Sequence, residues 1–208
     1  MNIREEYKTY LKNKLDYLWE DALKTYLDSN IYLQAFLIED KYKTDFMVLY
    51  TWYAIRERLV IGTRRLVEPD PKNEKLTIKS LVKFISKSDF CEQESDKQEV
   101  KRISDKFDMV FNSKEMERVK NLRDVFCHNM PKKEQYGCYN KDLMYILQNT
   151  LEILIQCYGW LDEEKVDKQQ LRTFAHDLAV VYWNNIINAI QPDTYSDKIK
   201  LFNKWLKE

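Results

Sequence analysis

Residues that break regular backbone structure are scarce in this chain. Its 208 residues include only three glycines and four prolines. Sandwiches and barrels need many turns, and they use both residues to make them. Long stretches of this chain contain neither residue, while 44% of its side chains are hydrophobic, which is enough to build a core. The sequence therefore predicts an all-α protein.

Apolar side chains that recur every three or four residues predict six helical stretches. These stretches cover about residues 3–27, 31–67, 77–86, 98–128, 140–159 and 168–190. Asp28-Ser29-Asn30 is expected to end the first helix and cap the next, and further breaks are expected near Asp40–Lys43 and at Asn112-Ser113. Residues 46–55 are apolar on nearly every side and are predicted to form the central buried helix.

The lengths of these helices predict a four-helix bundle. Four long amphipathic helices pack into an up-and-down bundle when short connections join them. We expect this bundle to span residues 1–160 and residues 161–208 to form a C-terminal helical extension packed on it. In the extension, we expect an apolar stripe made of Leu171, Phe174, Ala175, Leu178 and Tyr182.

Charge and hydropathy limit the partners of this chain. Lys and Arg total 34, and so do Asp and Glu, so the formal net charge is zero. Proteins that bind nucleic acid through bulk electrostatics are basic, so any contact with RNA must be a local patch. The N-terminal residues are charged, unlike a secretory signal, and the longest apolar run is about half of the ~20 residues that a membrane helix needs. We expect a soluble, cytoplasmic protein without a membrane partner.

The four cysteines do not predict a metal site. They show no C-x-x-C pair and no regular framework, so we expect free thiols. Cys127, His128, Cys138 and Cys157 are conceivable zinc ligands, but their spacing fits none of the usual structural zinc sites. We therefore expect neither a bound metal nor another cofactor.

One of the two histidines lies close to an arginine in the segment R-D-V-F-C-H-N, which contains Arg123 and His128. An imidazole can transfer a proton near neutral pH. A guanidinium can stabilise the charge that develops on a phosphoryl group. Asp124 is four residues before His128, so on a helix it can accept a ring N–H and fix the tautomer. These residue types suit the cleavage of RNA without a metal.

The spacing of the pair leaves its geometry open. Arg123 and His128 are about 140° apart on an ideal helix, so they do not meet on it. Either the helix frays before Pro131 and His128 turns, or the partner groups come from a second copy of the chain. The structural alternative is an ordinary Asp–His pair at the surface of a helix end. The chain has a second Arg–His pair, Arg172 and His176, which are one helical turn apart. We interpret this second pair as structural.

Basic and polar residues surround the segment. We expect substrate contacts from Asn129, Lys120, Lys132 and Lys133. The arginines between Arg56 and Arg65 can join these lysines in a basic patch that faces the phosphates of the substrate. A solvated helix face is an equally good interpretation of these arginines.

The segment L-R-D-V-F-C-H-N resembles the signature of the HEPN superfamily, which is an Arg, a polar residue, and a His after four to six intervening residues. The stretch Y-A-I-R-E-R-L-V-I-G-T-R-R-L-V-E-P-D is similar to the abortive-infection (AbiU-type) branch of that superfamily. The resemblance covers roughly residues 1–160. It implies an all-α, HEPN-like bundle, usually dimeric, in which many members are metal-independent endoribonucleases that act as toxins or antiphage effectors.

Carried onto this chain, the resemblance makes Arg123 and His128 the catalytic pair and Asp124 the polar residue after the Arg. It also implies RNA as the substrate, a homodimer through this region, and a possible antitoxin partner. Some relatives carry a Tyr two residues after the His, which a partner antitoxin modifies. This chain has Met130 there, so that mode of control is not expected. The competing class is a non-catalytic HEPN-like module that binds RNA, a nucleotide or a partner protein.

Overall fold

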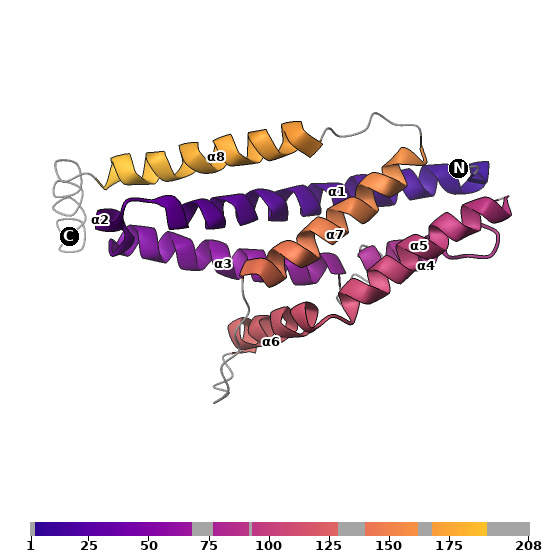
Figure 1. Cartoon of the computed structure of the whole chain (residues 1–208), viewed down its shortest axis with the longest axis horizontal. Coiled ribbons are helices and arrows are strands. Elements are labelled where there is room, and N and C mark those ends of the chain that lie inside the picture. Colours follow the sequence, from indigo (N-terminus) through magenta and orange to yellow (C-terminus); the bar gives the residue numbers. More distant parts are fainter. Residues whose placement is uncertain (1–2, 68–76, 92, 129–139, 162–167, 191–208) are drawn as a thin grey trace, which may run out of the picture. The chain divides into compact units, whose positions relative to one another are not determined.

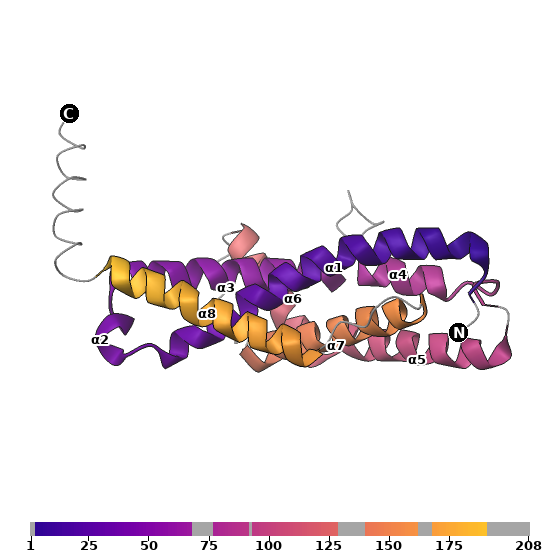
Figure 2. The same cartoon turned by 90° about the horizontal axis from the view of Figure 1, so that it is seen from above.

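The computed structural model describes residues 3–67, 77–91, 93–128, 140–161 and 168–190. Within these ranges the chain is helical and has no strand, apart from one isolated bridge between Ile3 and Cys91. The elements are α1 (Glu5–Gln34), the 3-10 turn η1 (Ala35–Leu37), α2 (Asp40–Lys43), α3 (Phe46–Val67), α4 (Ile78–Ile85), α5 (Glu94–Phe111), α6 (Lys114–His128), α7 (Asn140–Gly159) and α8 (Lys168–Ala189) (Figures 1 and 2). The predicted all-α class is confirmed.

The chain divides into two compact units. Unit 1 contains residues 1–26 and 57–168, and unit 2 contains residues 27–56 and 169–208. Helices α1 and α3 therefore each contribute to both units. Compactness alone defines these units, so they do not test the predicted boundary between the bundle and the extension at residue 160. That boundary stays a prediction.

Helix α7 supplies much of the interior of unit 1. It packs against α5 and α6, and α4 packs against α5. One line of α7 is buried at Leu143, Leu147, Leu151 and Leu154. A second buried line on the same helix consists of Asp142, Ile146, Thr150, Ile153 and Cys157. From α1, Leu11, Leu15, Leu18 and Ala22 are all fully buried.

Local capping fixes the start of α4. The Thr77 hydroxyl accepts a hydrogen bond from the Ser80 N–H at 3.2 Å, and the Ser80 hydroxyl accepts one from the Thr77 N–H at 3.2 Å. This reciprocal capping box satisfies two of the amide donors that a helix start leaves unpaired. The predicted helix at residues 77–86 is thus confirmed.

In unit 2, α8 is held by one aromatic anchor. Trp183 is buried, and its indole N–H donates a hydrogen bond to the Ile31 carbonyl oxygen at 2.6 Å. Ala175 and Ala179 are buried on the same line of α8. The predicted stripe is only partly right, because Phe174 is 57% exposed and Leu178 is 36% exposed. The small alanines and one Trp form the buried line instead.

Two other expectations are wrong. Asp28-Ser29-Asn30 does not end α1, which continues to Gln34, and Ser29 is fully buried inside it. Continuing the helix keeps Tyr26, Ile31 and Tyr32 buried, so packing overrides the weak local preference of the polar run. Residues 46–55 do not form a buried helix. Only one line of this segment is inside, with Val48 and Ile55 buried. Five large side chains are exposed: Phe46, Met47, Leu49, Tyr50 and Tyr53.

Candidate functional site

Helix α6 carries the candidate catalytic residues. It begins after a short break, as predicted, and the Ser113 hydroxyl caps it by accepting a hydrogen bond from the Met116 N–H at 3.1 Å. Val119 and Leu122 are buried on its inner face. The backbone stays helical through His128, so Asp124 and His128 are one turn apart on a continuous helix.

Arg123 is paired only weakly. Its Nε lies 2.9 Å from Asp124 Oδ1, which is ion-pair distance, but the N–H does not point at that oxygen. The Nε atom is buried and has no hydrogen-bond acceptor among the described residues. The Arg123 side chain is 27% exposed and that of Asp124 is 51% exposed. The ion pair is therefore open to solvent on the Asp124 side, whereas the Nε–H without an acceptor is buried.

The other predicted site residues are only partly described. His128 belongs to α6, but its side chain lies outside the described part of the structure, as do Asn129, Lys132 and Lys133. The predicted contact between Asp124 and His128 therefore stays a prediction. So does the reach of these three polar residues toward a substrate.

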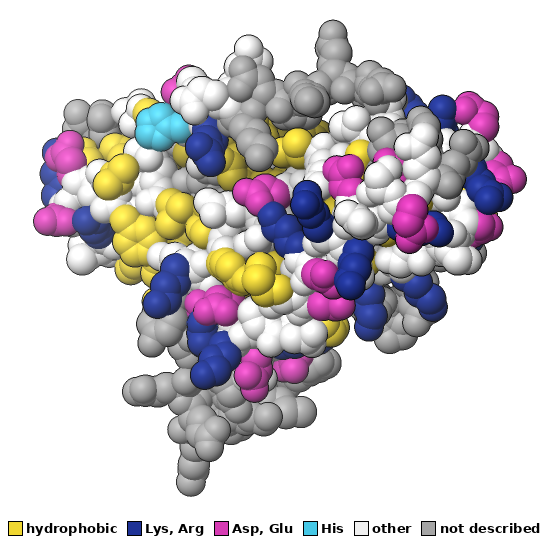
Figure 3. Space-filling view, turned by 45° about the vertical axis from the view of Figure 1, so that its right-hand side comes forward, with side chains coloured by type: hydrophobic (Ala, Val, Ile, Leu, Met, Phe, Trp, Pro, Cys, Tyr) yellow, Lys and Arg dark blue, Asp and Glu magenta, His cyan; other side chains and the backbone are white. Residues whose placement is uncertain are grey.

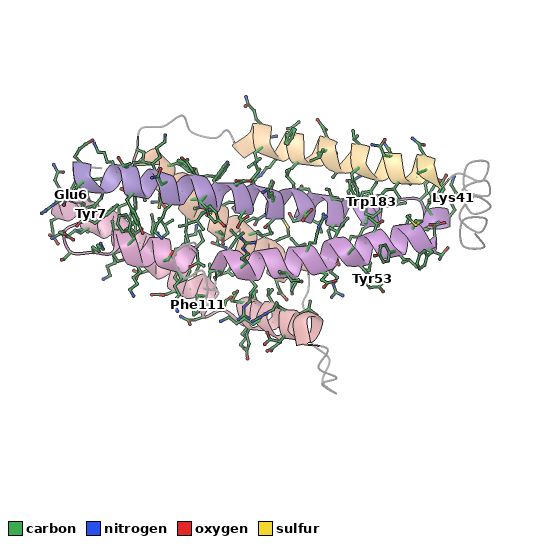
Figure 4. The ribbon with its side chains drawn as sticks, turned by 180° about the vertical axis from the view of Figure 1, so that it is seen from behind. Glu6, Tyr7, Lys41, Tyr53, Phe111 and Trp183 are labelled. Carbon is green, nitrogen blue, oxygen red and sulfur yellow. The ribbon has the colours of Figure 1, made fainter. Side chains whose placement is uncertain are left out.

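Lys120 packs on an aromatic ring. Its ammonium lies 4.2 Å from the centroid of the Phe111 ring, and the ammonium of Lys79 lies 5.0 Å from the same centroid. Phe111 is the last residue of α5 and is labelled in Figure 4. Two cations at one ring make a locally basic point at the corner between α5 and α6, where cation–π attraction offsets part of their repulsion.

The basic run of α3 is partly neutralised. Arg65 donates a hydrogen bond to the Tyr17 hydroxyl at 3.3 Å and lies 3.4 Å from the Asp21 carboxylate. Figure 3 shows Lys and Arg side chains interspersed with Asp and Glu over the face drawn. This mixed surface agrees with the zero net charge and favours the solvated-face interpretation for Arg65.

The most strongly bonded arginine of α6 was not predicted. Arg118 donates from Nε and Nη2 to the two oxygens of Asp142, at 2.8 and 2.7 Å, and from Nη2 to Glu115 at 3.1 Å. Asp142 lies in the first turn of α7 and is fully buried. The hydrogen bonds to this carboxylate raise the pKa of Arg118 above its ordinary value. The signal in the sequence was a charged residue, Asp142, on a mostly apolar line of α7.

Metal ligands do not gather in the described residues. No group of three or more His, Cys, Asp or Glu side chains there is arranged to hold an ion. Cys91 and Cys157 are buried free thiols, as expected, and burial raises the pKa of Cys157. The second Arg–His pair, Arg172 and His176, is exposed on α8.

Comparison with protein-family models, curated proteins and solved structures found no match for this chain. The roles of the site residues are therefore inferred from their positions and chemistry. Among the residues that the structure describes, no helix has the length and apolar character required to cross a membrane.

Proposed function

We propose that this chain is a metal-independent endoribonuclease of the HEPN type, acting as a toxin or antiphage effector, with Arg123 and His128 as its catalytic pair. The state of Arg123 is the observation that supports it most. Its side chain is partly exposed, and among the described residues its guanidinium forms an ion pair with a half-exposed carboxylate, that of Asp124. A phosphate group of the RNA backbone is an anion that the exposed part of such a guanidinium binds well.

The reaction needs one base, one acid and one charge stabiliser. The RNA 2′-hydroxyl attacks the adjacent phosphorus, the bond from phosphorus to the 5′-oxygen breaks, and a 2′,3′-cyclic phosphate and a 5′-hydroxyl form. One imidazole takes the 2′ proton and a second one protonates the leaving 5′-oxygen. Arg123 stabilises the negative charge of the pentacovalent transition state. The chain has one His at this site, so the second imidazole comes from a second chain.

We therefore propose a homodimer that places two copies of the Arg123–His128 segment opposite each other across a two-fold axis. Within each chain, residues 1–160 form a HEPN-like bundle and residues 161–208 an extension. The exposure of Asp124 supports this arrangement, because the outer face of α6 near the site is accessible to a partner. An antitoxin protein is a further proposed partner, and the cytoplasm is the proposed location.

The test is cleavage of RNA by the purified protein in EDTA. His128→Ala should lower the rate about 10²–10⁴-fold, because a general acid or base contributes about that much. Arg123→Ala should be comparably damaging, with an unchanged circular dichroism spectrum. His176→Ala is the matched control, since it removes an exposed imidazole from α8, and it should cleave at the wild-type rate. Activity that survives His128→Ala, or is lost only in His176→Ala, contradicts the proposal.

A mixing experiment tests the shared site. Wild-type and His128→Ala chains are refolded together in equal amounts, so that random pairing yields about a quarter fully wild-type dimers. If both imidazoles are needed, about a quarter of the dimer activity remains. If each chain holds a complete site, about half remains. A strictly monomeric and fully active protein removes the dimer proposal altogether.

A further inference from the structure

A basic and aromatic groove lies in unit 1, formed by the first turns of α1 and one face of α4. It has a volume of about 660 Å³, within the roughly 300–1,000 Å³ of typical small-molecule sites. Its lining residues are Glu6, Tyr7, Tyr10, Lys14, Ser80, Lys83, Phe84 and Lys87. Figure 4 labels Glu6 and Tyr7 at the start of α1.

Helical spacing brings these residues to one place. Tyr7, Tyr10 and Lys14 follow each other at three and four residues on α1, so they share one face. Ser80, Lys83, Phe84 and Lys87 do the same along α4 and the turn after it, and they are the lining residues of that side. Each helix therefore contributes both lysine and aromatic side chains to the groove.

The groove concentrates positive charge in a chain of zero net charge. Its lining has three lysines and one carboxylate, that of Glu6. The ammonium of Lys87 lies 5.4 Å from the Tyr7 ring centroid and 5.1 Å from that of Phe84. Lys14 is only 6% exposed, and its ammonium donates a hydrogen bond to the Ser80 hydroxyl at 3.0 Å. Burial lowers the pKa of Lys14, so an anion placed here stabilises its charged form.

Aromatic rings form the floor and one wall. Phe84 is buried, while Tyr10 is 48% exposed, and their ring centroids are 4.6 Å apart. The Tyr7 ring is held in place by its hydroxyl, which donates a hydrogen bond to Asp89 at 2.5 Å. The half-exposed Tyr10 ring, packed on Phe84 and close to ammonium groups, is suited to a flat, charged ligand, because the ring stacks on the ligand and the lysines bind its anionic part.

We propose that this groove binds a nucleoside phosphate, either free or as one residue of an RNA strand. Tyr10 stacks on the base. Lys83 and Lys87 bind the phosphate groups, and Glu6 accepts hydrogen bonds from the sugar hydroxyls. Arg123 is not among the residues that line the groove, and occupancy of the groove does not depend on cleavage.

The experiment measures ATP binding to the full-length protein by calorimetry, with adenosine and tripolyphosphate as probes of the two halves of the ligand. Lys83→Ala combined with Lys87→Ala should weaken ATP binding at least about tenfold, because it removes both ammonium groups that bind the phosphates. Tyr10→Ala should weaken it about fivefold or more, as loss of base stacking does. Adenosine and tripolyphosphate should each bind more weakly than ATP.

The matched control is Lys101→Ala combined with Arg102→Ala, which removes the same charge from exposed positions on α5 and should bind ATP like the wild type. Competition with a short single-stranded RNA distinguishes a free nucleotide from a nucleotide within RNA as the natural ligand. The RNA is added to His128→Ala protein so that the RNA is not cleaved. Competition with ATP indicates a nucleotide within RNA, and no competition indicates a free nucleotide. Either result supports the site.

Three results overturn the proposal: no ATP binding at millimolar concentration, equal losses in the control and the groove variants, or tripolyphosphate binding as tight as ATP with no effect of Tyr10→Ala. Thermal unfolding of each variant verifies that it is folded. Because the readout is binding, a failure here leaves the proposed ribonuclease activity untouched, and an inactive His128→Ala protein says nothing against the groove.

Discussion

Two arginines on α6, five residues apart, are in opposite situations. Arg118 makes three hydrogen bonds to carboxylates, two of them to the buried Asp142. Arg123 makes an ion pair with its half-exposed neighbour Asp124, and its Nε–H has no acceptor among the described residues. The first half of the helix is thus anchored to α7, and the second half holds a cation that can still bind a ligand.

The burial of the partner carboxylate explains why the two arginines differ. A fully buried carboxylate must have its charge compensated inside the protein, and Arg118 provides that compensation. Asp124 is compensated by water whether or not Arg123 is present, so their pairing contributes little. The same residue type therefore stabilises the fold at one position and remains available for function at the other.

The largest effect is expected for Arg118→Ala. Removal of the guanidinium takes two charge-assisted hydrogen bonds from the fully buried Asp142, and breaking a buried ion pair in this way costs about 3–5 kcal/mol. Urea unfolding followed by circular dichroism measures the loss. Glu115→Ala is the control on the exposed side of the same arginine, and it should cost less than about 1 kcal/mol, as exposed pairs do. Equal losses in the two variants would mean that Asp142 finds another partner.

A smaller effect is expected at the start of α6. Ser113→Ala removes the hydroxyl that accepts from the Met116 N–H, and loss of an N-cap costs about 1 kcal/mol. Ser104→Ala, within α5, is the control and should be neutral or slightly stabilising, because Ala is the better helix former. Thermal unfolding of the two variants compares them. If Ser113→Ala is as stable as Ser104→Ala, the helix start is held by packing and not by its cap.

The sequence predicted the helices that local signals define. Thr77 at the start of α4, the break at Asn112-Ser113 and Asn140 at the start of α7 all lie where the structure has them. It failed where tertiary packing decides, as in the continuation of α1 through Ser29 and in the exposure of Phe46. Periodicity shows which side chains share a face, but it cannot show whether another element covers that face.

The candidate site was predictable only in part. Chemistry singled out Arg123, because an Arg and a His in one short segment suggest phosphoryl chemistry. The pairing of Arg118 with Asp142 joins residues 24 positions apart, and single-sequence reasoning has no means of matching two charges at that separation. The groove between α1 and α4 was missed for the same reason, since Tyr10 and Lys83 meet only through the fold.

The smallest effect on stability is expected at the second arginine, Arg123. Arg123→Met keeps the length and apolar stem of the side chain but removes the Nε–H that has no acceptor among the described residues. An unsatisfied buried donor costs about 1–3 kcal/mol, and the loss of a partly exposed ion pair offsets only a part of that. We therefore expect Arg123→Met to be as stable as the wild type or slightly more stable in urea unfolding, while it loses RNA cleavage. Such a variant is typical of a residue kept for function at a cost in stability. A loss of 3 kcal/mol or more would instead place Arg123 with Arg118, as a second structural anchor of α6.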